Sequence, residues 1–323
     1  MKRFTDLNRR LLALALCLAG PAFASVTTSI PVGTDPKFVA VNQTTNLIYV
    51  SNFASNNVSV IDGATNTVVA TVPVGIQPEG LDVNPATNMI YVANYLGPTV
   101  SVIDGSTNTV VATIPGFSAP FGVAVNSVTN QVFVSNSNIS NVSVINGSSN
   151  TIAATITGLS GPYGVKVDST TNLAYVVNSA AGTVSVINGQ NDTVTSTFTL
   201  PQGAEPYSLA FDPITNRLFV TNGLPAVVYV LDASAGTLLA TITGGRVPFK
   251  RVADVSMFQP GKSVLISDSS LNAVVLVSEA TYAATAGMTG GNDPVGIAVN
   301  RHTGKIYVSE LGSDTVNVYT QPK

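Results

Sequence analysis

The chain has 323 residues, with 14 basic and 17 acidic side chains, so charged residues make up only 10% against about 25% in an average soluble domain. Exposed helices need more Glu and Lys than this, which excludes an all-α fold, and an apolar share of 45% excludes intrinsic disorder. One Cys and one His exclude disulfide scaffolds, thiolate zinc sites and most histidine-based catalysis.

Residues 1–24 have the pattern of a signal peptide. Four basic residues precede or border the apolar stretch 11–19, and Ala22-Phe23-Ala24 fits a cleavage site before Ser25. Nine apolar residues are too few to span a bilayer, which takes about 20. We therefore expect an exported protein, periplasmic or extracellular and not membrane-spanning, that begins at Ser25.

Charge also limits the partners of the exported protein. Residues 1–24 hold four of the basic and one of the acidic residues, so cleavage changes the net charge from -3 to -6. General binding to nucleic acid requires a basic surface that neutralises phosphates. We therefore expect no general nucleic-acid binding.

The rest of the chain repeats with a period of about 42 residues. Each repeat begins at a proline, and the successive spacings are 42, 42, 42, 44, 42 and 46. The prolines are Pro36, Pro78, Pro120, Pro162, Pro206, Pro248 and Pro294. A second segment of the first repeat reads Ile-Tyr-Val-Ser-Asn (48–52), a third reads Val-Ser-Val-Ile-Asp (58–62), and a fourth covers 67–72.

Four short β-branched strands per repeat, separated by Asn, Gly, Asp and Pro, are typical of a propeller blade. The seventh repeat lacks a fourth strand, and residues 25–32 resemble the fourth strand of the first repeat. The sequence therefore predicts an all-β fold. A seven-bladed β-propeller with four antiparallel strands per blade fills residues 25–323 as a single domain, and the N-terminal strand completes the last blade.

The Tyr-Val-Ser-Asn and Tyr-Val-Ala-Asn segments, each followed by Val-Ser-Val-Ile-Asp, resemble the YVTN β-propeller repeat family. This family includes YncE-like exported propellers of bacteria and archaeal surface-layer propellers. The resemblance covers essentially the whole chain after residue 24 and implies the fold. It implies little about activity, because one fold supports many functions.

Strand order places the loops on two faces. The loops that enter the first strand and leave the second strand of each blade share one face, here called the top face. The resemblance implies ligand binding at the mouth of the central channel on this face. The residues that follow the repeat prolines are expected to surround that mouth: Lys37, Glu79, Phe121, Tyr163, Tyr207, Phe249 and Val295. Aromatic rings there either cover the core between blades or stack on a sugar, peptide or base.

The second strands end in a further ring of polar residues: Asn52, Asn94, Asn136, Asn178, Asn222, Asp268 and Glu310. Asn in this position is typical of turns, where its side chain bonds nearby backbone. Asp268 and Glu310 are candidate ligands for Ca²⁺ or Mg²⁺, and the alternative is ordinary substitution in a loop. We otherwise expect no cofactor.

The loop that enters the sixth blade is about three residues longer than its counterpart and contains Arg246, Lys250 and Arg251. A basic loop on an acidic protein is a candidate site for a carboxylate, phosphate or acidic glycan. The alternative is a solvated loop that uses Asp254 as its own partner. On the innermost strands, Asp82 and Lys166 stand where other blades have alanine, and we expect them to reach water in the channel.

These residues favour an exported, non-catalytic, monomeric propeller that binds a small ligand, glycan or protein at the top-face channel mouth. The single His302 is expected in a bottom-face turn, away from any catalytic group at the mouth.

Two alternatives remain open. One is a metal-assisted lactonase- or lyase-like enzyme with Glu310, Asp268, Asn52 and Asn222 around a cation. The other is single-stranded nucleic-acid binding. It would combine Lys37 and the basic loop with the nearby aromatic side chains.

Overall fold

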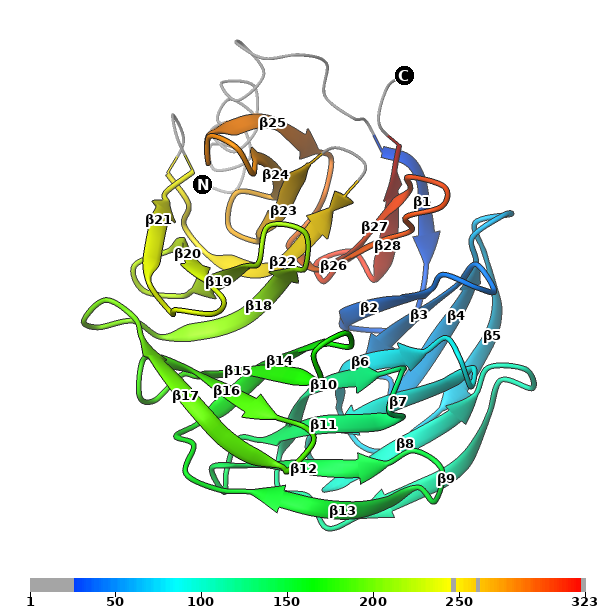
Figure 1. Cartoon of the computed structure of the whole chain (residues 1–323). Helices are drawn as coiled ribbons and strands as arrows, with labels where there is room; N and C mark the ends of the chain where they lie inside the picture. The colour runs from blue at the N-terminus through cyan, green and yellow to red at the C-terminus, as the bar shows by residue number, and fades with distance from the viewer. Residues whose placement is uncertain (1–25, 245–247, 260–261, 321–323) are drawn as a thin grey trace.

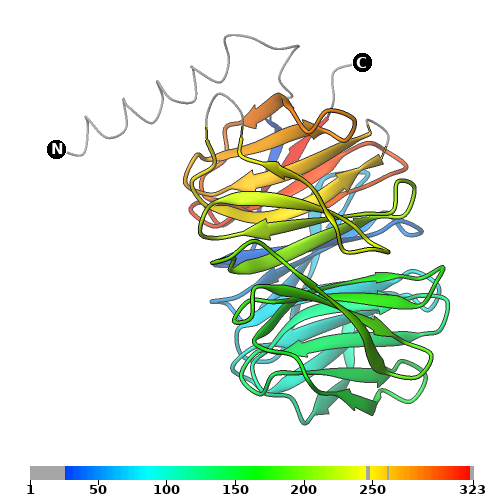
Figure 2. The same ribbon diagram turned by 60° about the vertical axis from the view of Figure 1, so that its left-hand side comes forward.

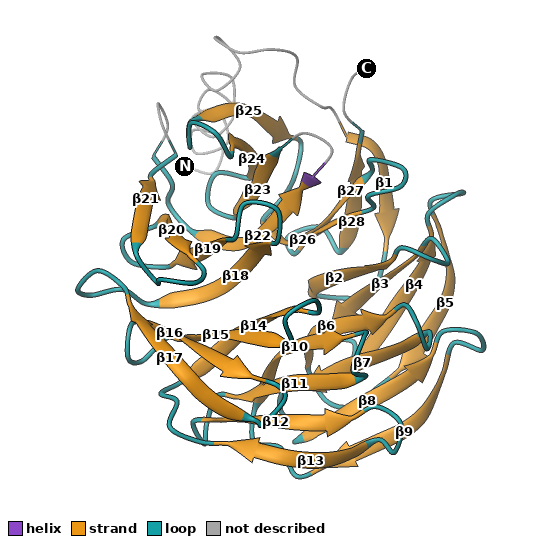
Figure 3. Ribbon diagram, viewed as in Figure 1, coloured by secondary structure: helices purple, strands orange, loops and turns teal. Residues whose placement is uncertain are grey.

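The computed structural model describes residues 26–244, 248–259 and 262–320. The predicted signal peptide (1–24) and Arg246 lie outside these ranges. Within them, 28 strands form seven four-stranded antiparallel sheets, one per blade (Figure 1). Figure 3 shows strands joined by short loops, with helical geometry only at Gln259. The predicted all-β, seven-bladed propeller is confirmed.

The first three blades follow one another without interruption. Blade 1 contains β2 (Pro36–Asn42), β3 (Leu47–Asn52), β4 (Asn57–Asp62) and β5 (Thr67–Pro73). Blade 2 contains β6 (Pro78–Asn84), β7 (Met89–Asn94), β8 (Thr99–Asp104) and β9 (Thr109–Pro115). Blade 3 contains β10 (Pro120–Asn126), β11 (Gln131–Asn136), β12 (Asn141–Asn146) and β13 (Thr151–Ile156).

The next three blades repeat this order. Blade 4 contains β14 (Pro162–Asp168), β15 (Leu173–Asn178), β16 (Thr183–Asn188) and β17 (Thr193–Thr199). Blade 5 contains β18 (Pro206–Asp212), β19 (Arg217–Asn222), β20 (Val227–Asp232) and β21 (Leu238–Ile242). Blade 6 contains β22 (Val252–Phe258), β23 (Ser263–Asp268), β24 (Ala273–Ser278) and β25 (Ala284–Thr289).

Blade 7 joins the two ends of the chain. It contains β26 (Pro294–Val299), β27 (Ile306–Glu310) and β28 (Thr315–Tyr319), and β1 (Val26–Pro31) pairs with β28 as its outer strand. Figures 1 and 2 show this blue N-terminal strand beside the red C-terminal strands. The predicted closure of the ring by the N-terminal strand is confirmed.

The innermost strand of each blade contacts the innermost strands of both neighbours, and β26 contacts β2, so these seven strands surround the axis. The second strand of each blade is the most buried; Ile48, Tyr49 and Val50 of β3 are fully buried. Apolar clusters lie between adjacent blades because both faces of a sheet must be covered. The described residues contain no apolar helix of membrane-spanning length.

Asparagine-rich turns link neighbouring blades on the bottom face. Asn46 has a φ of 57°, a left-handed conformation that Asn adopts more readily than most residues. The Asn42 side chain accepts from the backbone of Thr44 and donates 2.7 Å to the Asn88 side chain in blade 2. Three equivalent bonds join other blades: Asn84 to Asn130, Asn126 to Asn172, and Asn300 to Asn46. These bonds explain why the repeat retains Asn in its turns.

Candidate functional site

The second residue of each innermost strand lies at the top-face end of the channel. This ring, here called the mouth ring, consists of Lys37, Glu79, Phe121, Tyr163, Tyr207, Ala253 and Val295. Six of these residues match the positions predicted from the repeat prolines. The sixth blade differs.

Phe249 does not belong to the mouth ring, which corrects the sequence prediction. Val252 pairs with Asp268 across β22 and β23, as Pro206 pairs with Asn222 in blade 5. Pro248 therefore precedes the strand within a longer loop, and the ring position falls on Ala253. Phe249 is buried instead in the apolar cluster between blades 5 and 6.

Four aromatic rings meet across the axis at the mouth. Phe121 contacts Phe38 at 5.8 Å, Tyr163 at 4.8 Å and Tyr207 at 5.3 Å between centroids, all in edge-to-face geometry. The two tyrosine rings lie 5.6 Å apart. Edge-to-face contacts of this kind are favourable because the positive ring edge meets the negative ring face. This aromatic cluster covers the top of the channel, with Phe121 almost fully buried at its centre.

Two charged residues of the mouth ring lie beside the aromatic cluster. Lys37 Nζ is 3.8 Å from Asp35 Oδ2 and 5.1 Å from the centre of the Phe53 ring. Glu79 is 8% exposed, and its Oε2 has no hydrogen-bond partner among the described residues. Burial raises the pKa of Glu79 to about 7, although the Lys37 charge opposes this rise. A buried acceptor without a donor is costly, so Glu79 is suited to accept a hydrogen bond from a ligand.

A groove of about 540 Å³ begins next to the aromatic cluster on the top face. Its wall includes the half-buried Tyr163, and the rest is formed by small or hydroxyl residues and Glu205 from the loops of blades 3 to 5. The lining residues are Ser137, Gly161, Tyr163, Ser179, Ala180, Gly203, Ala204 and Glu205. The groove combines one aromatic ring with several hydrogen-bonding groups.

The basic loop of the sixth blade lies on the same face, with both Lys250 and Arg251 exposed. The backbone N–H groups of these two residues donate to the Asp268 carboxylate, at 2.7 and 3.2 Å. Asp254, which the alternative interpretation made the partner of this loop, lies elsewhere: it is buried on β22 and accepts a bond from Ser208. The entry loop of blade 6 is longer than in the other blades, so the residues after Pro248 do not take the strand positions expected from the repeat. This explains why Asp254 was placed wrongly.

The ends of the second strands hold the entry loops in place. Asn136 donates to Asn141 and Ser143 and accepts from the Ser118 backbone, and Asn178 in blade 4 repeats this pattern. Glu310 in blade 7 only accepts: from the Asn292 backbone at 2.6 Å and from the Asn317 side chain at 3.1 Å. Asn317 stands where most blades have Ser, so an amide donor compensates for the lost donor of Asn.

Asp268 has an equivalent role, because it accepts four backbone N–H bonds, including those from Ser270 and Leu271. The described residues contain no group of three or more His, Cys, Asp or Glu side chains arranged to hold a metal. Binding of Ca²⁺ or Mg²⁺ at Asp268 or Glu310 stays a prediction.

Glu310 predicts a pH dependence of stability. Burial raises its pKa from 4.5 in the unfolded chain to about 7, so the folded chain holds a proton that the unfolded chain releases. The free energy of unfolding should therefore fall as pH rises from about 4.5 to 7, by on the order of 2–3 kcal/mol for this group. Melting curves from pH 5 to 8 should show a shallower fall for Glu310→Gln. Glu205→Gln, at an exposed site, should follow the wild type; equal slopes in all three would contradict the prediction.

The comparisons with known proteins agree with this fold. A family model described as YNCE-like beta-propeller matches residues 6–152. This match covers just under half of the chain and agrees with the resemblance seen in the repeats. No curated protein matches the sequence. The structure is similar to a solved chain from Kuenenia stuttgartiensis hydrazine synthase, with a TM-score of 0.82 and 16% identity over 90% of this chain and 97% of that one. At that identity the likeness shows the fold alone.

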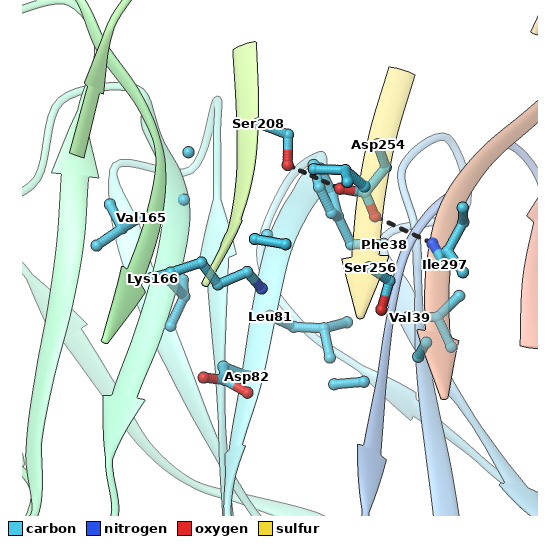
Figure 4. Close-up of a pocket in the computed structure, with 18 of the residues that line it drawn as sticks. Phe38, Val39, Leu81, Asp82, Val165, Lys166, Ser208, Asp254, Ser256 and Ile297 are labelled. Carbon is cyan, nitrogen blue, oxygen red and sulfur yellow. Dashed lines mark hydrogen bonds between the residues drawn. The ribbon is translucent and has the colours of Figure 1, made fainter. Parts of the chain in front are cut away.

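The propeller also has a central cavity below the aromatic cluster. Its volume is about 360 Å³, and the innermost strands supply its walls. Asp82 and Lys166 line it, as the sequence predicted, together with Asp254, Ser208 and Ser256 (Figure 4).

Two important residues, Phe38 and Asp254, were not recognised in the sequence as members of the site. They occupy the third position of their strands, where four other blades have glycine: Gly80, Gly122, Gly164 and Gly296. A Cβ on Gly80 would lie 2.2 Å from the Phe121 carbonyl oxygen of the next blade, so glycine permits close approach. The Pro-x-Gly pattern was therefore the available signal, and departures from it mark the residues around the channel.

Proposed function

We propose that this chain is an exported, non-catalytic propeller that binds a ligand at the top face, in the groove beside the aromatic cluster. One observation carries the proposal: Tyr163 belongs both to the aromatic cluster and to the groove wall. Its ring is thereby held rigid by its neighbours while one side faces the groove. A rigid, half-exposed aromatic ring surrounded by hydroxyl groups and a carboxylate suits a sugar, which presents both an apolar face and hydroxyls.

The polar groups support the same class of ligand. Ser137, Ser179 and Glu205 line the groove and provide two hydroxyls and a carboxylate. The chain's single histidine is exposed in the turn after β26, where its Nδ1 lies 3.0 Å from the Gln43 carbonyl oxygen on the bottom face. The groove therefore lacks a nearby imidazole for acid–base chemistry. Export rests on residues 1–24 and is part of the proposal.

The proposal predicts that Tyr163→Ala weakens binding about fivefold or more. Stacking on the ring provides about 1 kcal/mol or more, whereas Tyr163→Phe keeps the ring and should stay within about threefold of wild type. The measurement is titration calorimetry with peptidoglycan fragments and neutral or acidic oligosaccharides, after a thermal-shift screen. Tyr282→Ala is the matched control, because Tyr282 lies in the turn after β24, with its ring 5.4 Å from the Arg217 guanidinium.

Three results would contradict the proposal. The first is the absence of binding to every member of the panel. The second is equal affinity in wild type and Tyr163→Ala. The third is turnover of any panel member, which would overturn the non-catalytic part and favour an enzyme.

A further inference from the structure

The central cavity is separated from the top-face groove by the aromatic cluster. Phe38, Phe121 and Tyr207 line its upper end. At the other end the lining includes Gln43 and the exposed Arg301, which lie in the turns after β2 and β26. The cavity therefore reaches the bottom face, and a molecule inside it would not touch Tyr163.

Asp254 and Asp82, the two acidic side chains of the cavity, are held in fixed positions by neighbouring blades. Asp254 is 7% exposed; its Oδ1 accepts from Ser208 Oγ at 2.7 Å and its Oδ2 from the Ile297 N–H at 3.0 Å. Asp82 Oδ2 accepts from the Val125 N–H at 2.9 Å. Figure 4 shows both carboxylates directed to the same space. These bonds leave part of each carboxylate's acceptor capacity for a ligand.

Lys166 extends from β14 into the space between the two carboxylates (Figure 4). Its ammonium makes no hydrogen bond or ion pair with any described residue. Burial raises the pKa values of Asp82 and Asp254, and the Lys166 charge opposes this rise and favours their ionised forms. An ammonium carries three donors, and its partners inside the channel must come from water or a ligand. Hydrogen bonds to neighbouring blades hold the two carboxylates in place, and neither forms an ion pair with Lys166.

The charges of the lining balance. Asp82 and Asp254 provide two negative charges, and Lys166 and Arg301 provide two positive charges. A simple anion would meet Lys166 but face two carboxylates, and a simple amine would meet the carboxylates but face Lys166. A molecule with one group of each sign satisfies both without changing the net charge. A volume of about 360 Å³ is at the small end for ligand cavities.

We propose that the central cavity binds a small zwitterion, an amine–carboxylate compound whose carboxylate pairs with Lys166 and whose ammonium pairs with Asp254. This site is distinct from the top-face groove and does not depend on the proposed function there. The ligand enters from the bottom face, past Arg301.

The test is titration calorimetry at low ionic strength and pH 7.5, with glycine, 4-aminobutanoate and 6-aminohexanoate as zwitterions of increasing charge separation. Butanoate and butylamine supply each charge alone. At least one zwitterion should bind ten times more tightly than either single-charge probe. Lys166→Met and Asp254→Asn should each weaken its binding at least tenfold. The controls Lys250→Met, at an exposed site, and Asp232→Asn, at the half-buried end of β20 outside the cavity lining, should not.

A variant that fails to fold can only lose binding, so a predicted gain of binding serves as a control for folding. Lys166→Met leaves the two carboxylates without a nearby ammonium, so this variant should bind butylamine more tightly than wild type does. Asp254→Asn should likewise improve butanoate binding. Tyr163→Ala should bind the zwitterion as wild type does, which separates this site from the groove. Three results would overturn the proposal. None of the zwitterions binds, or butanoate or butylamine binds as tightly as the best zwitterion. The third is that folded Lys166→Met and Asp254→Asn bind butylamine and butanoate no more tightly than wild type does.

Discussion

A chain that lacks residues 26–32 will aggregate or melt far below the intact protein. Removing β1 exposes the full length of β28 as an unpaired edge strand, and such an edge pairs readily with other chains. It also removes Ile30, which is 3% exposed and packs with Ile48 and Val316 between blades 7 and 1. The measurement is size-exclusion chromatography with light scattering, together with a thermal melt.

Point substitutions in the same strand provide the control. Ile30→Asp places a charge in the core between two blades and should destabilise the protein by on the order of 4 kcal/mol. Ser29→Asp adds the same charge at an exposed site one residue earlier and should have an effect within about 0.5 kcal/mol. A monomeric truncated chain with an unchanged melting temperature would show that β1 does not stabilise the ring.

Gly122→Ala is the second substitution with a large expected effect. A Cβ on this residue would lie 2.4 Å from the Tyr163 carbonyl oxygen and 3.0 Å from the Val165 nitrogen, both backbone atoms of blade 4. Backbone of a neighbouring sheet cannot give way locally, so blades 3 and 4 would have to separate. We expect a loss of about 3 kcal/mol or more in the free energy of unfolding.

The matched control for this substitution is Gly223→Ala, in the loop that leaves β19. A Cβ there would lie 3.9 Å from the Glu205 carbonyl oxygen, an ordinary contact. Urea denaturation of both variants measures the difference, and the slopes should stay equal because the exposed surface is unchanged. Comparable stability of the two variants would mean that the blades tolerate a wider spacing than the structure indicates.

The repeat in the sequence predicted the fold because most interactions that build a propeller lie within one blade or between adjacent blades. Closure joins the two ends of the chain, and it was predicted because the seventh repeat lacks a fourth strand that the N-terminal segment can supply. The mouth ring was predicted for the same reason, except in blade 6. There Pro248 was taken as the start of the repeat, but pairing of Val252 with Asp268 sets the register.

The site contains interactions that the repeat in the sequence cannot predict. Phe121 of blade 3 contacts Phe38 of blade 1 and Tyr207 of blade 5, which are not its neighbours in the ring. Asp254 faces the channel because its side chain bonds Ser208 and Ile297 on the strands at either side. These contacts depend on which residues depart from the repeat and on how their side chains meet across the axis.

The hydrogen bonds between the bottom-face turns connect some pairs of adjacent blades and not others. Asn side chains connect blade 7 to blade 1 and continue without a break to blade 4. Asp168 and Asp212 take the equivalent place in blades 4 and 5, and a carboxylate has no N–H to donate onward. Blade 7, where the two chain ends meet, therefore belongs to the run of blades that these side-chain bonds connect. Blades 5 and 6 are joined instead by a bond from the Gln259 side chain to Asp212. We therefore expect partial opening of the ring between blades 4 and 5, which leaves the closure of blade 7 intact.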